Sequence, residues 1–370
     1  MKSLPQKFDT SNLFEDIRRM IEDARSAVAT AVNAGLTMLY WHIGRRIRED
    51  VLNEKRAQYG KEIVVTLSRQ LVTEYGNGYS EKNLRRMIQF AEKFPDERIV
   101  ATLSRELSWS HFTSLIPLSK PLQRDFYAEM CRMERWNVRT LRKKIGTMLY
   151  ERTALSKKPD ELAKLELQTL RGQDRLTPDI VFCDPYLLDF LGLKSAYQEK
   201  DLEDAILREL ESFIMELGSG FTFVARQKRI IVDHDDFYLD LLFYHRDLQR
   251  LIAVELKLDK FRPEHKGQME LYLRWLDRYE CKPGEDIPLG IILCSGKNDE
   301  RIELLELGKS GIHVAEYLTV LPPKELLQKK LHSAIASARE RLARQLEPRN
   351  APAGVEGSTD RRKARKGKKK

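Results

Sequence analysis

The chain has 370 residues, of which 42% are apolar and 33% charged, and its formal net charge is +9. This length is sufficient for two domains of ordinary size, each with its own core. The four cysteines form no CxxC pair and have no metal-ligand spacing, which argues against a disulfide framework and a zinc site. The sequence shows neither a signal peptide nor an apolar run long enough to span a membrane, so we expect a cytoplasmic protein.

The positive charge is concentrated at the carboxyl end of the chain. The last ten residues, RRKARKGKKK, contain eight Lys or Arg and no acid, so residues 1–360 retain a net charge of only +1. We expect residues 326–370 to form a helix followed by a disordered basic tail. Such a tail can bind polyanions without sequence specificity, or it can act only as a solubilising end.

Residues 1–150 are expected to form an all-helical domain. Apolar residues recur at intervals of three and four, as in Leu36, Tyr40, Ile43 and Ile47. Residues that commonly begin or end helices mark further helix boundaries, namely Gly76, Ser80, Pro121 and Asn137.

A short turn, GNGYS at residues 76–80, separates two of these helices, as in a helix-turn-helix motif. The second helix carries Lys82, Arg85 and Arg86, which are candidates for binding nucleic acid. A solvated basic helix face is the commoner origin of such a pattern. The helical domain is therefore expected to engage either DNA or another subunit of a homo-oligomer.

Residues 151–178 are polar and are expected to form a linker with one exposed helix. From residue 179 to about residue 325 the pattern changes, because β-branched and aromatic runs alternate with helical segments. The predicted order is helix, three strands, helix, strand. Short polar turns indicate that the three strands form an antiparallel meander, and the long helix after them permits a crossover to a parallel strand. The chain is thus predicted to be an α/β protein with an all-helical amino-terminal domain.

The third strand of the meander contains two charges inside an apolar run, LIAVELKLD at residues 251–259. Because side chains alternate along a strand, Glu255 and Lys257 share the face opposite to the apolar residues. In the preceding strand, FYLDLLFYH at residues 237–245, Asp240 lies opposite an apolar face expected to include every other residue from Phe237 to Phe243. A hairpin turn about residues 247 and 248 places Asp240 directly across from Glu255, with Cβ atoms roughly 5 Å apart.

Two carboxylates this close repel each other unless a cation lies between them. Asp240 and Glu255 are therefore candidate ligands for Mg²⁺, for which Mn²⁺ is expected to substitute. Lys257 cannot coordinate a metal while protonated, but it can orient a water molecule or neutralise charge on a phosphoryl oxygen. The alternative is a Glu-Lys pair on a solvated sheet face, which the ExK pattern alone favours.

Two further polar residues extend this cluster. Glu203 lies within the apolar stripe of the helix predicted at residues 201–217, although a first-turn Glu also stabilises a helix dipole. Gln268 lies early in the helix that follows the ExK strand, where an amide can bind water or phosphate, or can simply be exposed. Arg226 and Lys228, in the first strand, are expected near the site and favour a polymeric phosphate substrate.

The combined pattern of Glu203, Asp240, Glu255, Lys257 and Gln268 in this element order resembles the PD-(D/E)XK nuclease superfamily. Within it, several stretches over residues 15–325 are similar to the YhcG-like bacterial family, including LRELESFIMELGSGFTFVARQKRI, FYLDLLFYH, LIAVELKLDKFRPEHKGQMELYL, YGNGYSEKNLRRMIQFAEKFP and LSWSH. The resemblance implies a restriction-endonuclease-like domain that cleaves nucleic acid with a metal, in a DNA-processing or restriction-associated role. Asp240 and Glu255 would be metal ligands, and Lys257 the catalytic lysine. Leu239, where the superfamily pattern has Pro, is a departure that leaves the carboxylate chemistry unchanged.

The function predicted from sequence is thus a Mg²⁺-dependent nuclease, most simply an endonuclease of DNA. A non-catalytic nucleic-acid-binding or assembly protein that retains the fold is one alternative, but such a protein has no use for buried like charges. A metal-dependent phosphatase of small molecules is a second alternative.

Overall fold

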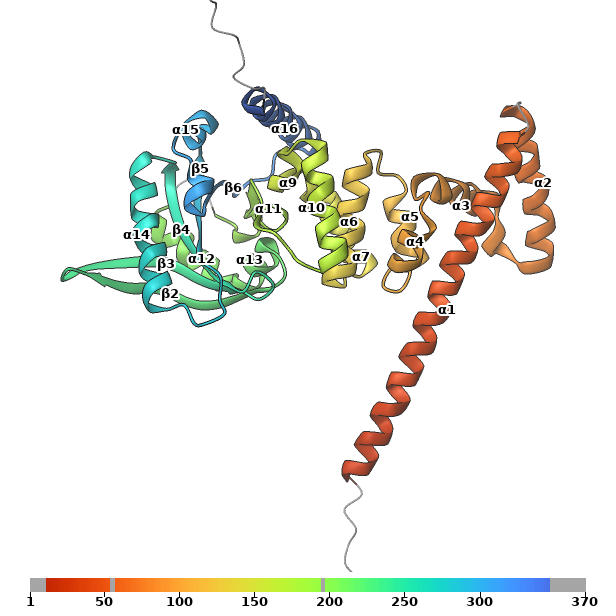
Figure 1. Cartoon of the computed structure of the whole chain (residues 1–370), viewed down its shortest axis with the longest axis horizontal. Helices are drawn as coiled ribbons and strands as arrows, with labels where there is room; N and C mark the ends of the chain where they lie inside the picture. Colours follow the sequence, from red (N-terminus) through yellow and green to blue (C-terminus); the bar gives the residue numbers. More distant parts are fainter. Residues whose placement is uncertain (1–10, 54–56, 194–196, 347–370) are drawn as a thin grey trace, which may run out of the picture.

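The computed structural model describes residues 11–53, 57–193 and 197–346 (Figure 1). Helices occupy one end of the molecule and a six-stranded sheet with flanking helices occupies the other. The predicted basic tail at residues 361–370 lies outside the described residues. No helix among the described residues is long and apolar enough to cross a membrane.

The described part of residues 1–146 contains helices and no strand. The helices are α1 (Ser11–Asn53), α2 (Ala57–Tyr75), α3 (Glu81–Lys93), α4 (Glu97–Leu103), α5 (Trp109–Leu115), α6 (Pro121–Glu134) and α7 (Val138–Gly146), with a 3-10 turn, η1 (Asn77–Tyr79). Gly76 follows α2 with φ 87°, a conformation that glycine adopts readily. Asn137 caps α7 through its side chain, which accepts from the Thr140 N–H at 2.9 Å. Ser80 precedes α3 as predicted, but its hydroxyl makes no capping hydrogen bond.

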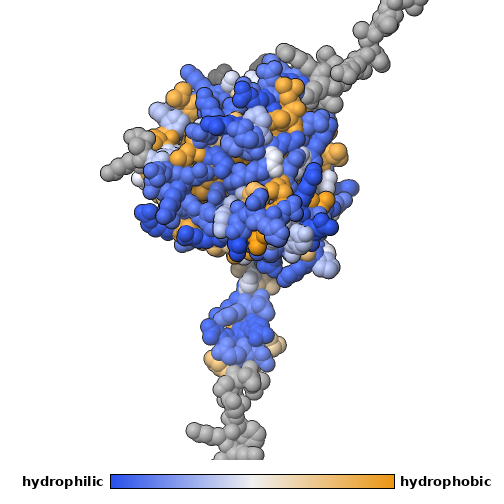
Figure 2. Space-filling model, turned by 90° about the vertical axis from the view of Figure 1, so that its left-hand side faces the viewer, coloured by the Kyte–Doolittle hydropathy of each residue, from blue (hydrophilic) through white to orange (hydrophobic). Residues whose placement is uncertain are grey.

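The second half of α1 is packed tightly into the helical domain. A Cβ atom added to Gly44 would lie 1.9 Å from the Met87 carbonyl oxygen of α3, so the absence of a side chain lets the two helices approach closely. Trp41, also on α1, is buried and donates its Nε1 hydrogen bond to the Phe94 carbonyl oxygen at 2.8 Å. The first half of α1 projects away from the body of the molecule (Figures 1 and 2).

Residues 151–178 were predicted from their polarity as a linker with one exposed helix, but they pack against their neighbours. They contribute to α8 (Leu149–Arg152), α9 (Ala154–Lys157) and α10 (Asp160–Gln173), whose apolar side chains Leu155, Leu167 and Leu170 are buried. These side chains belong to one core cluster that extends from Trp41 of α1 to Tyr317 of the sheet. The two predicted domains therefore share a continuous core, because the amphipathic helices between them bury their apolar faces against both.

The sheet has the strand order β1-β6-β5-β4-β3-β2. Its strands are β1 (Tyr186–Leu187), β2 (Phe221–Val232), β3 (Asp235–His245), β4 (Arg250–Lys260), β5 (Leu289–Gly296) and β6 (Ile312–Leu318). β2, β3 and β4 form the predicted antiparallel meander, and β5 is parallel to β4, as the crossover through α14 (Pro263–Tyr279) predicts. The restriction-endonuclease-like fold class is confirmed, with β1 as a short addition paired parallel to β6.

Helices cover both faces of this sheet. One face packs against the shared core and against α12 (Glu199–Arg208) and α13 (Leu210–Leu217), while α14 packs against the other face. The remaining elements are α11 (Pro178–Val181), α15 (Asp299–Leu304), α16 (Lys324–Leu346) and two 3-10 turns, η2 (Asp189–Leu191) and η3 (Leu307–Ser310). The single helix predicted at residues 201–217 is divided into α12 and α13 at Glu209, whose ψ of 33° leaves the helical range.

Candidate functional site

The candidate site is centred on the β3–β4 hairpin. Leu241 pairs with Val254 in β4, which confirms the predicted hairpin register. One step further along, the Asp240 side chain replaces the backbone ladder, because its Oδ2 accepts a hydrogen bond from the Leu256 N–H at 2.8 Å. Asp240 is therefore held against β4 beside Glu255 by the hairpin itself.

The apolar pattern of β3 changes faces at the same point. Leu241 and Phe243 pack into the shared core, whereas Leu239 packs into the cluster beneath α14. The prediction that these residues share one face is therefore wrong. Gln227, on the neighbouring strand, has a left-handed φ of 44°, and this irregularity accompanies the change.

Glu255 lies at the centre of a chain of hydrogen bonds. Its Oε1 accepts from Lys257 Nζ at 2.9 Å and from Gln268 Nε2 at 3.0 Å. Gln268 also donates to the Tyr272 hydroxyl at 2.7 Å, and Lys257 reaches Glu199 of α12 at 3.4 Å. Polar side chains of two different helices, α12 and α14, thus meet beside Glu255 on the hairpin.

Gln227 is a member of the cluster that the sequence interpretation missed. Its Nε2 donates to Glu203 Oε2 at 2.9 Å and to Asp240 Oδ1 at 3.1 Å, so it links the α12 carboxylate to β3. The sequence held a signal for Gln227. Counting residue pairs outward from the β2–β3 turn, as for the β3–β4 turn, places Gln227 opposite Asp240. Tyr272 was also missed. Its signal was its spacing, because it lies one helical turn after Gln268 on α14 and so shares the same helix face.

Burial determines the electrostatics of the two central carboxyl groups. Glu255 is only 4% exposed, and burial together with the nearby Asp240 charge raises its pKa to about 7, although Lys257 opposes the shift. Burial also raises the pKa of Asp240. Burial disfavours the Lys257 ammonium, but Glu255 outweighs this and raises the Lys257 pKa above its ordinary value, so the ammonium stays protonated at neutral pH.

Two buried oxygens of this cluster have no hydrogen-bond partner, Glu255 Oε2 and Glu203 Oε1. Arg226 Nε lies 3.9 Å from Glu203 Oε1, which is an ion pair without a hydrogen bond. Buried carboxylate oxygens without donors fit a hard cation such as Mg²⁺. The described residues contain no group of three or more His, Cys, Asp or Glu side chains close enough to hold a metal ion. The fit is therefore to an ion held by one or two carboxylates, with water and phosphate oxygens as its other ligands, which is the usual situation of protein-bound Mg²⁺.

The two basic residues predicted in β2 differ in their placement. Arg226 is exposed at the edge of the cluster, near Glu203. Lys228 instead donates to Glu280 at 2.7 Å beyond the end of α14 and lies 6.0 Å from the centre of the Trp275 ring. Its ammonium is therefore engaged away from the carboxylates. Arg226 and Lys228 would share a face of a regular strand, but the irregular backbone at Gln227 lies between them and their side chains reach different partners.

The basic residues predicted in the helical domain lie on α3. Arg85 forms an ion pair with Glu81 one turn earlier, at 2.6 Å. Lys82 is exposed and Arg86 is half-buried. α2, η1 and α3 have the order of a helix-turn-helix, and these residues lie on a different part of the molecule from the carboxylate cluster (Figure 1).

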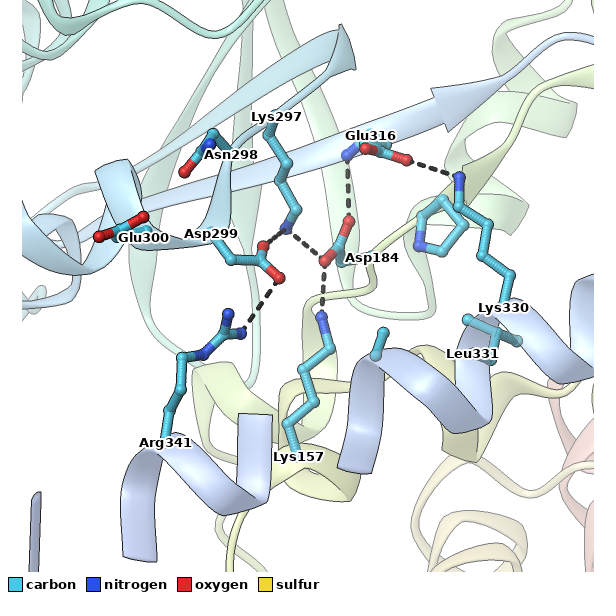
Figure 3. Close-up of a pocket in the computed structure, with 12 residues that line it drawn as sticks. Lys157, Asp184, Lys297, Asn298, Asp299, Glu300, Glu316, Lys330, Leu331 and Arg341 are labelled. Atoms are coloured by element: carbon cyan, nitrogen blue, oxygen red, sulfur yellow. Dashed lines mark hydrogen bonds and ion pairs between the residues drawn. The ribbon is translucent and has the colours of Figure 1, made fainter. Parts of the chain in front are cut away.

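A separate pocket of about 450 Å³ lies between the sheet, α9 and α16 (Figure 3). At its centre, buried Asp184 pairs with Lys157 at 2.6 Å and with Lys297. Burial alone would raise the pKa of Asp184, but the two ammonium groups outweigh it and hold that pKa below its ordinary range. Arg341 of α16 pairs with Asp299 at 3.1 Å in the same pocket. Because the central charges neutralise one another, we interpret this pocket as a junction between the sheet and the helices; Glu300, also in its lining, is exposed.

Comparisons with known proteins assign both halves of the chain. The DUF1016 N-terminal domain family matches residues 16–152, and the YhcG PDDEXK nuclease domain family matches residues 179–332. A protein of Escherichia coli (strain K12) named "Putative nuclease YhcG" is 33% identical over 350 residues, which cover 86% of this chain and 92% of the relative.

Two solved structures match a smaller part of the chain. One is the crystal structure of a repair endonuclease from Pyrococcus abyssi, with 24% identity over 35% of this chain and 50% of that chain. The other is the structure of EndoMS in apo form, with 20% identity over 35% of this chain and 49% of that chain. Both have a TM-score of 0.24, which supports no conclusion beyond the family matches. By those family matches and its full-length relative, the chain belongs to the YhcG family, in which a DUF1016 N-terminal domain precedes a PDDEXK nuclease domain.

Proposed function

We propose that the chain is a Mg²⁺-dependent endonuclease of DNA whose active site is the cluster around Asp240 and Glu255. The observation that carries this proposal is the buried Glu255 beside the half-buried Asp240, each held by its own hydrogen bonds next to a protonated Lys257, with the Glu255 Oε2 lacking any donor. The nuclease family supplies the reaction class. The role in DNA processing or restriction rests on the same resemblance.

The side chains divide the reaction between them. Asp240 and Glu255 would hold the cation, which when bound supplies a Lewis acid and lowers the pKa of an attacking water. Lys257 cannot act as a base while its pKa is raised, so its ammonium stabilises the negative charge that develops on the phosphoryl oxygens. Gln268 and Tyr272 hold Glu255 in orientation through Oε1, leaving Oε2 free. The water oxygen releases a proton to solvent and forms a bond to phosphorus, while the bond to the leaving sugar oxygen breaks and that oxygen takes up a proton from solvent.

Around this centre, Glu203 and Gln227 form the α12 side of the site. Gln227 satisfies one Glu203 oxygen and one Asp240 oxygen, which fixes the distance between α12 and β3. Arg226 is exposed at the rim and is the basic residue placed to contact a DNA phosphate next to the cluster. Lys228 would have to release Glu280 before contacting DNA. On the other domain, Lys82, Arg85 and Arg86 remain candidates for a more distant DNA contact.

The proposal is tested by cleavage of linear, nicked, branched and single-stranded DNA and of RNA, with Mg²⁺ or Mn²⁺. Asp240→Asn and Glu255→Gln are expected to lower cleavage at least about 1,000-fold, because each removes a hard anionic ligand while preserving side-chain shape. Asp236→Asn is the matched control, since Asp236 is exposed on the same strand as Asp240 and forms an ion pair with Arg229 on β2. Unchanged cleavage by both site variants would refute the assignment, and cleavage of RNA alone would refute the DNA substrate.

A further inference from the structure

The first half of α1 exposes an apolar stripe that the rest of the described chain does not cover. Val28 is 64% exposed and Val32 is 56% exposed, and Phe14, Ile17, Ile21, Leu36 and Leu39 are also exposed. No Asp, Glu, Lys or Arg occurs between Arg25 and Arg45. Isolated helices depend on packing for most of their stability, so an uncovered apolar stripe of this length marks an interaction surface.

The stripe has a spacing that reads the same in both directions along the chain. At 100° per residue, its members fall within a sector of about 120° on α1. They follow one another at intervals of 4, 3, 4, 4, 4, 3 and 4 residues, as Ile17, Ile21, Ala24, Val28, Val32, Leu36, Leu39 and Ile43. The midpoint of the pattern is Thr30. An identical helix running in the opposite direction therefore presents an apolar residue opposite every member of the stripe.

We propose that α1 forms an antiparallel pair with α1 of a second copy of this chain, centred at Thr30. Val28 lies opposite the partner's Val32 in this pair, Ile21 opposite the partner's Leu39, and Ile17 opposite the partner's Ile43. The paired segment is about 40 Å long at 1.5 Å per residue.

A groove in the helical domain supports the same arrangement independently. An open, mainly apolar groove of about 480 Å³ lies between the second half of α1 and α2, lined by Leu39, Ile43, Ile47, Leu67, Leu71 and Tyr75. The antiparallel pair places the first half of the partner helix, with its Phe14, Ile17 and Ile21, along this groove. The projecting half of α1 in Figure 1 and the empty groove are thus complementary parts of one surface, and two-fold symmetry uses each of them twice.

The charges of α1 are compatible with this pairing and favour a second copy over an unrelated partner. The charged segment at residues 15–25 lies opposite residues 35–45 of the other chain, which carry only Arg45 as a full charge. Arg45 already pairs with Glu49 at 3.0 Å and with Glu97 at 3.5 Å. Arg25 faces the partner's Gly35, where an added Cβ meets no atom within 4 Å, so there is room for the guanidinium. Arg46, which also lines the groove, lies opposite the partner's Phe14 and is paired with Asp50 of its own chain.

The first test is the mass of the full chain in solution. The parent is expected at twice the mass of one chain by sedimentation equilibrium, and Val28→Glu with Val32→Glu is expected to raise the dimer dissociation constant at least about 100-fold. Thr30→Glu is the matched control, because Thr30 is exposed on the opposite side of the same helix. A monomeric parent, or a dimer that the double variant leaves intact, would overturn the proposal.

The second test fixes the direction of the pair and does not depend on how the charged variants fold. In a Cys281→Ser background, which removes the half-buried native cysteine, Ile21→Cys and Leu39→Cys chains are prepared separately and mixed under mild oxidation. The mixture is expected to give a disulfide-linked dimer that neither variant gives alone, since equivalent positions lie about 27 Å apart along the pair. Cross-linking of each variant with itself would indicate a parallel pair. The absence of a cross-link both in the mixture and in the separate variants would exclude the helix contact. Either result would overturn the antiparallel arrangement.

Discussion

The nuclease sheet and the projecting half of α1 both depart from the usual arrangement in which charged residues are exposed and apolar residues are buried. The sheet buries carboxylates around Glu255, and α1 exposes aliphatic side chains around Val28. Each arrangement is unfavourable for the isolated chain, because buried charge and exposed apolar surface both cost free energy. The comparison teaches that the two costs call for different remedies. The proposed cation would relieve the first cost at one point, whereas only a long apolar surface, such as the proposed second α1, would relieve the second.

The largest effect that sharpens this comparison is expected from Lys257, the cation already present in the buried site. Lys257→Met should lower cleavage about 100- to 1,000-fold, because it removes a donor to the developing phosphoryl charge. Calorimetric Mn²⁺ binding should persist, since an ammonium is not a metal ligand. Lys260→Met, three residues along β4 and exposed, is the matched control. Loss of both cleavage and Mn²⁺ binding in Lys257→Met would indicate that Lys257 has a structural role instead.

The cost of burying Glu255 should be visible as pH-dependent stability without metal. Its pKa rises from an ordinary 4.5 to about 7 on folding, so the folded state binds the proton more tightly than the unfolded state. Stability in EDTA should therefore fall as pH rises from about 4.5 to about 7, by on the order of 3 kcal/mol. Glu255→Gln cannot ionise and should lose this dependence.

The matched control for that experiment is Glu300→Gln on exposed α15, which should retain the parent profile. Mg²⁺ should restore parent stability most at and above pH 7, because the ion binds the deprotonated carboxylate. A flat parent profile between pH 4.5 and pH 7 would contradict the buried-charge interpretation. Melting temperature and urea unfolding are the measurements.

Gly44 tests the boundary between the packed half of α1 and its projecting half. Gly44→Ala places a methyl group against the backbone of Met87, which cannot rotate away, so the helical domain should lose about 1–3 kcal/mol of unfolding free energy. Gly172→Ala in α10, where an added Cβ meets nothing within 4 Å, should be neutral or slightly stabilising. Equal stabilities of the two variants in urea would show that α1 does not approach α3 this closely.

The smallest effect is expected from the basic tail. Removing residues 361–370 should weaken DNA binding without changing substrate preference, because eight positive charges in a short segment contact phosphates without regard to sequence. Each lost phosphate contact should reduce the slope of log affinity against log salt by about 0.9. A slope identical to that of the full chain would show that the tail does not touch DNA.

The hairpin part of the candidate site was predictable because its geometry is local. Strand alternation places Glu255 and Lys257 together, and the turn length sets the register that brings Asp240 beside them. The fold class followed from the same strand and helix periodicities. The linker prediction failed because polar composition does not reveal whether an amphipathic helix packs against the rest of the protein. Leu155, Leu167 and Leu170 are in fact buried in the shared core.

The amino-acid sequence by itself determined which residues carry charge, that Glu255 and Lys257 share one face of β4, and how the apolar stripe of α1 is spaced, since these depend only on periodicity along the chain. The tertiary structure alone decided that Gln227 reaches Glu203 of α12, that α12 and α14 meet beside Glu255, and that a groove lies beside the stripe. These features join residues far apart in sequence. Packing of whole elements fixes them, and no local pattern encodes how two helices approach one strand.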